Sequence, residues 1–443
     1  MQKYLFDKEW SSMNYEEARA YLDDAARYGS VLGLETMKKL LTRLGNPQDA
    51  LRFIHIGGTN GKGSVLSYIS AVLKEAGYRV GRYISPTLFS YRERIQINEI
   101  YIKKEALARL TTQIRSCIDE MVRDGEPHPT AFEIETALCF LYFKEENCDL
   151  VVLEVGMGGL EDATNVIQTT VLEVLASISM DHMGFLGNSL AEIAACKAGI
   201  IKPGTAVASM RQKPEAMEVI EQTCRIQNAA LSIADPADAE DIVYGCEEQS
   251  FSYGGYRDLK IHLAGSYQIA NAVLAVEAIK RLGELGYAIP EQALRDGLQK
   301  AVWRGRFTIL QRDPYFIIDG AHNRDGAKVL ADSIRRYFDG RRLHYIMGVF
   351  KDKEYETIID QMSAFDADVI AVETPDNPRA LPAELLADAW KKRKADVIYE
   401  KNIENAVKES LKRAKKDDVI LAFGSLSFLG EIVKALDKAQ SEV

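Results

Sequence analysis

The sequence lacks the features of several protein classes. No apolar run among its 443 residues is long enough to span a membrane, and residues 1–4 carry no apolar signal core. No run of basic residues occurs, and the formal net charge of −10 argues against general nucleic-acid binding. We therefore expect a cytoplasmic protein with neither a membrane nor a nucleic acid as partner.

The cysteines lack the C-x-x-C spacing that is typical of zinc sites and redox motifs. The chain has six of them, scattered at positions 117, 139, 148, 196, 224 and 246. This scatter predicts reduced, mostly buried thiols rather than a disulfide framework or a zinc site.

The sequence also lacks internal repeats and low-complexity tracts. Its composition is that of an ordinary globular protein. Apolar residues make up 47% of the chain and charged residues 27%. A chain of 443 residues is too long for one ordinary core, so two or three domains are expected.

The most informative segment is a glycine-rich loop that contains a lysine. An apolar run at 53–56 leads into Gly58-Thr59-Asn60-Gly61-Lys62, and a helical pattern follows from Val65 to Glu75. Glycines allow the backbone to approach phosphates, backbone N–H groups and the helix N-terminus face the negative charge, and a lysine neutralises it. The alternative is a glycine turn that merely joins a strand to a helix. The segment predicts a site for a nucleoside triphosphate.

This loop differs from the usual phosphate loop, in which a hydroxyl residue directly follows the lysine. Gly63 stands in that place, and the hydroxyl comes one position later, at Ser64. We therefore expect other segments to supply ligands to the metal ion.

The order of strands and helices predicts an α/β protein. Apolar runs at 53–56, 80–84, 150–155 and 173–179 alternate with helical patterns, as in a wound parallel sheet. Glycine-broken strands at 242–264 and helices at 268–282 and 290–302 follow. Strands then recur at 315–319, 344–349, 367–373, 396–400 and 418–423, each before a helical stretch, which predicts a Rossmann-like unit. We place the domain boundary near Ala301, giving domains 1–301 and 302–443 with a hinge at 303–307.

Several polar residues follow strands of the first sheet, where ligands bind in such folds. Glu154 ends an apolar strand, and a carboxylate there can hold the magnesium ion of a bound nucleotide; the less favoured alternative is a solvated glutamate at a strand end. Asp181-His182 follows the next strand, and Ser85 precedes a proline in what could be a common turn. Lys197 lies in a small, apolar stretch and by composition alone reads as a snorkelling helix lysine.

In the second domain, Asp319-Gly320-Ala321-His322-Asn323 closes an apolar strand and opens a helix. This places an acid, a histidine and a helix N-terminus toward the cleft between the domains.

These segments, taken in order, resemble one family. The matching segments are Gly58 to Ser64, Glu154 to Asn165, Asp181-His182, Lys197 to Pro203, Gly265 to Asn271, Gly305-Arg306-Phe307 and Asp319 to Asn323. Together they resemble the folylpolyglutamate synthase/dihydrofolate synthase family of the Mur ligase superfamily, over nearly the whole chain. The resemblance implies a phosphate-loop domain like the central domain of Mur ligases, followed by a Rossmann-like C-terminal α/β domain that corresponds to the glutamate ligase domain.

The resemblance also implies roles for individual residues. ATP would be bound by Thr59, Asn60, Gly61, Lys62, Gly63, Ser64, Asn271, Arg306 and Asp319. Two Mg2+ ions would be held by Ser85, Glu154, His182 and Lys197, the last carboxylated by CO2. Lys62, Lys197 and His322 would be catalytic, with His322 near the terminal phosphate. The pterin part of the substrate would lie against Thr130, Ala131, Phe132, Glu133, Glu161, Asp162 and Ala163.

The chain departs from the family pattern at a few positions. Leu160 and Glu161 replace an arginine and an apolar residue after the double glycine, and Arg304 and Arg324 replace prolines. The Leu160-Glu161 change lies in the pterin segment, so it bears on substrate preference.

The implied activity is an ATP-dependent ligase that adds L-glutamate to the γ-carboxyl of tetrahydrofolate (poly)glutamates through an acyl phosphate. Whether it also adds glutamate to dihydropteroate stays open, and a monomer is expected. One alternative is a UDP-muramyl peptide ligase, which would need a domain for the UDP group that the first 50 residues are too few to form. Another is a phosphate-loop ATPase switch, which would require neither Lys197 nor the segment 319–323.

Overall fold

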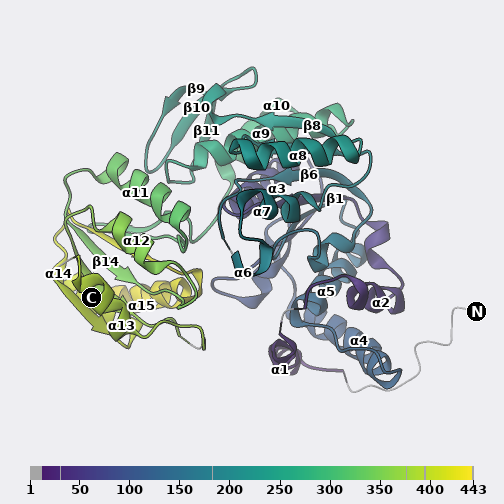
Figure 1. The fold of residues 1–443 in the computed structure, drawn as a ribbon, viewed down its shortest axis with the longest axis horizontal. Coiled ribbons are helices and arrows are strands. Elements are labelled where there is room, and N and C mark those ends of the chain that lie inside the picture. The colour runs from purple at the N-terminus through teal and green to yellow at the C-terminus, as the bar shows by residue number, and fades with distance from the viewer. Residues whose placement is uncertain (1–11, 30, 182, 376, 394–395, 442–443) are drawn as a thin grey trace, which may run out of the picture.

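The structure is a computed structural model that describes residues 12–29, 31–181, 183–375, 377–393 and 396–441. Its strands form sheets of eight, three and six strands. Helices cover the two larger sheets, which lie side by side as two lobes (Figure 1). The expected α/β fold, a wound parallel sheet followed by a Rossmann-like unit, is confirmed. Within these ranges, no helix combines the length and the apolar character that a membrane crossing requires.

The first sheet has the strand order β4-β3-β2-β5-β1-β6-β7-β8 and is parallel from β2 to β8. Its strands are β1 (Phe53–Gly57), β2 (Val80–Tyr83), β3 (Ile95–Ile97), β4 (Ile100–Tyr101), β5 (Leu150–Glu154), β6 (Thr170–Leu175), β7 (Ala206–Met210) and β8 (Ala230–Ala234). β3 and β4 form an antiparallel edge. The carboxyl ends of β1, β2, β5 and β6 therefore meet at one edge of the sheet.

Helices pack on both faces of this sheet because successive strand residues point to opposite sides, and both sides are apolar. On one face lie α3 (Lys62–Glu75), α9 (Gln268–Glu284) and α10 (Glu291–Lys300). On the other lie α1 (Tyr15–Asp24), α2 (Glu35–Arg43), α4 (Lys104–Arg123), α5 (Ala131–Glu145), α7 (Leu190–Ala198) and α8 (Pro214–Ile226). Shorter helices are α6 (Met183–Leu186), η1 (Ala25–Tyr28), η2 (Pro47–Ala50), η3 (Tyr91–Arg94), η4 (Ala163–Val166), η5 (Pro236–Asp238) and η6 (Leu426–Phe428).

The small antiparallel sheet consists of β9 (Glu240–Val243), β10 (Gln249–Tyr253) and β11 (Tyr256–Ile261). It packs on α9 and α10, at the top of the view in Figure 1. The β-rich insert expected at 242–264 is thereby confirmed.

The six-stranded sheet forms the second lobe, with the strand order β12-β13-β17-β14-β15-β16. Its strands are β12 (Thr308–Arg312), β13 (Tyr315–Ile318), β14 (Leu343–Met347), β15 (Ala367–Val372), β16 (Val397–Glu400) and β17 (Val419–Phe423). On one face pack α11 (Arg324–Phe338), α12 (Tyr355–Met362) and α13 (Ala383–Lys391), and on the other α14 (Ile403–Arg413) and α15 (Leu429–Ser441). Each of the five expected strands is followed by a helix.

The strand expected at 173–179 is wrong in its position, because β6 ends at Leu175. The chain leaves the sheet there and meets the glycine-rich loop: the backbone N–H groups of Thr59 and Asn60 donate to Ser177 O, at 2.7 and 3.2 Å. The antiparallel strand β12 was not predicted, because its residues are all partly exposed and do not alternate.

Candidate active site

The glycine-rich loop joins β1 to α3 and has the backbone that a phosphate site requires. Gly58 and Gly61 have φ angles of 136° and 89°, which only glycine adopts readily. A Cβ at Gly58 would lie 2.9 Å from the Cβ of Ala176, and one at Gly61 would lie 2.5 Å from Oδ1 of Asn271. Helix α3 begins at Lys62, so its first N–H groups face the loop.

Two lysines meet at this loop. Nζ of Lys62 donates to the carbonyl oxygens of Gly58 and Thr59, at 3.1 and 3.3 Å, and Nζ of Lys197 donates to the same Gly58 oxygen at 3.0 Å. Lys197 is only 4% exposed. Burial and the nearby charge of Lys62 lower the pKa of Lys197 to about 7. A substantial share of this amine is therefore neutral at neutral pH.

Glu154 and Ser85 lie at the ends of neighbouring strands, beside the loop. The backbone N–H of Ser85 donates to Oε2 of Glu154 at 3.2 Å. Burial raises the pKa of Glu154, and Lys62 opposes that shift. Among the described residues no group of three or more His, Cys, Asp or Glu side chains could hold a metal ion. The expected ligand His182 lies outside the described residues. A carboxylate and a hydroxyl residue are still the hard oxygen donors that suit Mg2+, which keeps several waters.

The segment after β13 joins the second lobe to the first. The buried carboxylate of Asp319 accepts hydrogen bonds from the backbone N–H groups of Phe307 and Ala321, at 2.7 and 2.8 Å, and from the hydroxyl of Tyr267 at 2.9 Å. Tyr267 precedes α9 of the first lobe. Burial raises the pKa of Asp319, and Arg306 opposes that shift. Asp319 therefore connects the hinge with both lobes.

Further contacts bring the second lobe against the phosphate loop. Nδ2 of Asn323 donates to Oδ1 of Asn60 at 3.3 Å and to Oδ2 of Asp181 at 3.1 Å. Nζ of Lys353 donates to Oδ1 of Asp181 at 3.0 Å. Nδ1 of His322 donates to Gly320 O at 2.8 Å, and burial beside Lys353 lowers its pKa. His322 is thus neutral at neutral pH, with Nε2 left as an acceptor.

A cavity of about 260 Å3 lies between the lobes at this point. It brings together residues from both lobes: Asn60, Gly61, Ser64, Asn271, Arg306 and Asp319, which were predicted to bind the nucleotide, and His322, which was predicted to be catalytic. Ser64 accepts a hydrogen bond from Gln268, which in turn accepts one from Asn271, at 3.3 and 3.1 Å. Thr59 and Gly63 lie in the same loop, and Gly63 packs on Trp303.

The two segments predicted to hold the pterin adjoin each other. A Cβ at Gly156 would lie 2.5 Å from the ring of Phe132, and Ala131, Phe132 and Ala163 share one core cluster. Glu133 is committed to capping α5, because its Oε2 accepts from the N–H and the hydroxyl of Thr130, at 2.8 and 2.9 Å. That carboxylate therefore shapes the segment rather than facing outward.

Asp162 is also committed to its own loop, whereas Glu161 is exposed. Oδ2 of Asp162 accepts from Met157 N at 2.8 Å, and Oδ1 accepts from the N–H and hydroxyl of Thr164, at 3.0 and 2.5 Å. The Thr164 hydroxyl lies 2.9 Å from Nε2 of the buried His55 on β1. A chain of hydrogen bonds thus connects the strand before the phosphate loop with the segment after β5.

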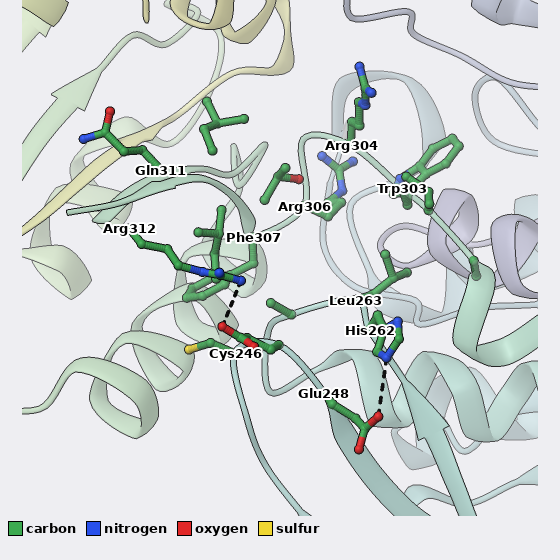
Figure 2. A pocket seen from close by; sticks show the side chains of 17 residues that line it. Cys246, Glu248, His262, Leu263, Trp303, Arg304, Arg306, Phe307, Gln311 and Arg312 are labelled. Atoms are coloured by element: carbon green, nitrogen blue, oxygen red, sulfur yellow. Dashed lines mark hydrogen bonds and ion pairs between the residues drawn. The ribbon is translucent and has the colours of Figure 1, made fainter. Parts of the chain in front are cut away.

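Sequence reasoning missed Tyr267 and Lys353, whose importance depends on contacts between distant segments. It also missed the cavities beside the hinge. One is an open groove of about 950 Å3 between the small sheet, the hinge and β12. Figure 2 shows Arg306 and Arg304 at one end of this groove, and His262 and Glu248 at the other. The motif Gly305-Arg306-Phe307 marks Arg306 in the sequence, but no local pattern marks His262 or Glu248 as part of a groove.

Comparison with known proteins agrees with this geometry. Residues 56–279 match the family model of the Mur ligase middle domain, and residues 305–426 match that of the Mur ligase, glutamate ligase domain. Two lobes that close on a phosphate loop, matched by these two domains, define an ATP-dependent ligase of the Mur type.

Individual relatives show to which family of Mur-type ligases the chain belongs. The chain is 36% identical over 436 residues to the dihydrofolate synthase/folylpolyglutamate synthase of Bacillus subtilis strain 168, covering 95% of this chain and 99% of the relative. The crystal structure of folylpolyglutamate synthase from Thermotoga maritima is 33% identical, with a TM-score of 0.83 over 96% of this chain and 97% of that chain. The Mycobacterium tuberculosis folylpolyglutamate synthase complexed with ADP is 28% identical, with a TM-score of 0.86 over 96% and 99%. The chain belongs to the folylpolyglutamate synthase/dihydrofolate synthase family.

Proposed function

We propose that this ligase adds L-glutamate to the γ-carboxyl group of tetrahydrofolate and its polyglutamates, and also joins glutamate to dihydropteroate. The observation that carries the proposal is the meeting of Lys62, Lys197 and Glu154 at a loop against which the second lobe closes. The Bacillus subtilis relative, which matches over nearly its full length, carries both activities in its name. We assign residues 1–301 to the ATP-binding domain and residues 302–443 to the glutamate ligase domain.

ATP would occupy the phosphate loop and the cavity of about 260 Å3. The triphosphate would lie on the backbone N–H groups of 59–64, with Lys62 neutralising its charge. Asn271 would lie on the adenine side, and Arg306 and Asp319 would contact the nucleotide from the hinge and the second lobe. The related Mycobacterium tuberculosis structure, which holds ADP, supports the binding of an adenine nucleotide.

Mg2+ would be held near the γ-phosphate by Ser85, Glu154, His182 and a carboxylated Lys197. The neutral amine of Lys197 can attack CO2 and release a proton, which gives a carbamate anion. The low pKa of Lys197 favours this step, because it supplies the neutral form. When bound, two Mg2+ ions would neutralise the charge that develops on the transferred phosphoryl group.

The chain's own residues would then make amide formation possible. A free carboxylate reacts poorly with an amine, because its oxygen is a poor leaving group. Attack of the γ-carboxylate oxygen on the γ-phosphorus releases ADP and forms an acyl phosphate, from which the amine of glutamate displaces phosphate. Lys62 and Arg306 would stabilise the phosphoryl group in transfer, and the neutral His322 would accept a hydrogen bond through Nε2. Closure of the lobes would keep water from hydrolysing the intermediate.

The pterin would lie at the adjoining segments 130–133 and 161–163. Phe132 supplies a partly exposed aromatic face there, and Asp162 and Glu133 keep the two segments in place. Leu160 is 54% exposed. It stands where an arginine is usual, so we expect substrate preference to depend on this position.

ADP release tests the proposal directly. We expect release in the presence of ATP and Mg2+ only when a folate and L-glutamate are both added. Tetrahydrofolate and dihydropteroate, assayed side by side, distinguish the two activities. Steady ADP release without either substrate would instead indicate a phosphate-loop switch, and would contradict the proposal.

A further inference from the structure

A separate cavity of about 300 Å3 lies beside the hinge, at the edge of the first sheet formed by β2, β3 and β4. Its walls come from these strands, the loop after β2 and the hinge. They include Arg82, Pro86, Phe89, Tyr101, Trp303 and Arg304. We call it the hinge cavity. None of the residues predicted to bind ATP, Mg2+ or the pterin lines it.

Arg82 is a buried cation without an adequate partner. The residue is 4% exposed, its guanidinium donates no hydrogen bond to any described residue, and its Nε is buried and unpaired. Its one ion pair within the described part of the chain is loose: Nη1 lies 3.8 Å from Oε1 of Glu99, whose other oxygen is held by Lys74. A buried charge is costly unless hydrogen bonds satisfy it, so the guanidinium of Arg82 is suited to bind an anion in the cavity.

The other charges around the hinge cavity leave it positive. The carboxylate of Glu93 is committed to backbone N–H groups of the loop 88–90, at 2.7 to 2.9 Å. Lys300 is paired with Glu75 at 2.6 Å. The exposed Arg304 has no ion pair among the described residues and lies 5.5 Å above the ring of Phe89.

The hinge cavity adjoins the candidate active site. A Cβ at Gly63 of the phosphate loop would lie 2.1 Å from the indole of Trp303, and the guanidinium of Arg82 lies 5.5 Å from the same ring. Arg82 is also three positions before Ser85, whose N–H donates to Glu154. An anion bound to Arg82 would therefore be separated from the phosphate loop by one aromatic ring.

We propose that the hinge cavity binds a carboxylate of a glutamyl group, held by Arg82 inside and Arg304 at the rim. This inference rests on the proposed function. Two carboxylate sources exist, the folate to be extended and the incoming glutamate, and the geometry points to the α-carboxylate of the folate. The α-carboxylate lies a few bonds from the γ-carboxylate that reacts. The hinge cavity lies beside Ser85 and Glu154, the predicted metal ligands of the first lobe, and not in the second lobe. Dihydropteroate has no glutamyl group, so Arg82 and Arg304 would be specificity-determining for folates alone.

Steady-state kinetics of Arg82→Gln and Arg304→Gln, with each acceptor in turn, test the inference. Loss of a charge-assisted hydrogen bond predicts that KM for tetrahydrofolate rises roughly 10-fold to 100-fold in Arg82→Gln, and several-fold in Arg304→Gln. KM for dihydropteroate, KM for L-glutamate and kcat should stay unchanged. Arg82→Lys, which keeps the charge, should restore part of the affinity for tetrahydrofolate.

Arg312→Gln is the matched control, because Arg312 flanks the same hinge but is paired with Glu247 and lines the other groove (Figure 2). We expect Arg312→Gln to change neither kcat nor the KM for any of the three substrates. An equal loss with both acceptors would reveal a structural role for Arg82, and a rise in KM for L-glutamate would assign the site to the incoming amino acid; either result overturns the inference. If Arg82→Gln fails to fold, Arg304→Gln tests the inference in its place, because the side chain of Arg304 is exposed. Wild-type protein that is inactive with both acceptors would instead refute the proposed function.

Discussion

Lys62 and Lys197 donate to the same carbonyl oxygen, that of Gly58, at 3.1 and 3.0 Å. Two cations on one acceptor repel each other, so the arrangement favours loss of a proton from the more buried one. That residue is Lys197, whose pKa is lowered to about 7. A carbamate at Lys197 would turn this repulsion into attraction, because it reverses the sign of its charge.

Replacing Lys197 by alanine should therefore abolish activity. We expect turnover to fall roughly 100-fold or more, because an anionic group beside the metal and the γ-phosphate would be lost. Added short carboxylic acids should partly restore it by occupying the space. The exposed Lys213→Ala serves as a control and should behave like the wild type. Full activity of Lys197→Ala would disprove the carbamate.

The carboxylation of Lys197 should depend on pH. Only the neutral amine reacts with CO2, and a pKa of about 7 means that its share rises as the pH increases through 7 and then levels off. The initial rate of carbamate formation, followed by carbon-13 NMR with labelled CO2 at a constant dissolved concentration, should follow that curve. A midpoint near the ordinary lysine pKa of about 10.4 would show that Lys197 is not perturbed.

The contact between Lys353 and Asp181 should help to hold the lobes together. Both side chains are 10% exposed and come from different lobes. Lys353→Met removes the charge and leaves Asp181 with weaker partners, so kcat/KM should fall roughly 10-fold or more. Small-angle scattering with a non-hydrolysable ATP analogue should show a larger radius of gyration. The neighbouring, exposed Lys351→Met is the control, and an equal effect there would exclude a specific role for Lys353.

A buried histidine in the second lobe should make stability depend on pH. Nδ1 of His344 lies 2.7 Å from Asp368, and Nε2 lies 3.0 Å from Asp418. Burial alone would lower the pKa of His344, but these carboxylates outweigh it and raise the pKa. The pKa values of Asp368 and Asp418 are lowered.

The stabilisation is complete below the unfolded histidine pKa of about 6.5 and is lost as the pH rises through the raised folded value. At the acid end it is lost as the pH falls through the lowered pKa values of the two aspartates. We expect His344→Gln to lower the free energy of unfolding by about 3 kcal/mol near pH 6, with a smaller difference at pH 9. Denaturant titrations at both pH values measure this. A difference that does not change with pH would contradict the ion pair.

The sequence predicted those features of the fold and the site that local patterns determine. Strand ends of a parallel sheet gather at one edge, so the loop 58–62, Ser85 and Glu154 could be placed together before the structure was known. The contact of Lys353 with Asp181 could not, because it depends on how the hinge orients the two lobes. The contact of Arg82 with Trp303 could not either, because it depends on where the hinge segment packs on the first lobe. The strand expected at 173–179 was placed wrongly because Ser177 pairs with the phosphate loop rather than with the sheet. An apolar run alone does not reveal that the chain leaves the sheet at Leu175 and pairs with the loop.

Isotope transfer tests the central claim most directly. The γ-carboxyl oxygens of tetrahydrofolate would be labelled with oxygen-18, and the phosphate released with ATP, Mg2+ and L-glutamate would be analysed by mass spectrometry. Attack of the carboxylate on the γ-phosphorus predicts one labelled oxygen in each phosphate, since the bond to carbon breaks when the amine displaces phosphate. Phosphate that forms without label, while the amide still appears, would contradict an acyl phosphate in this cleft.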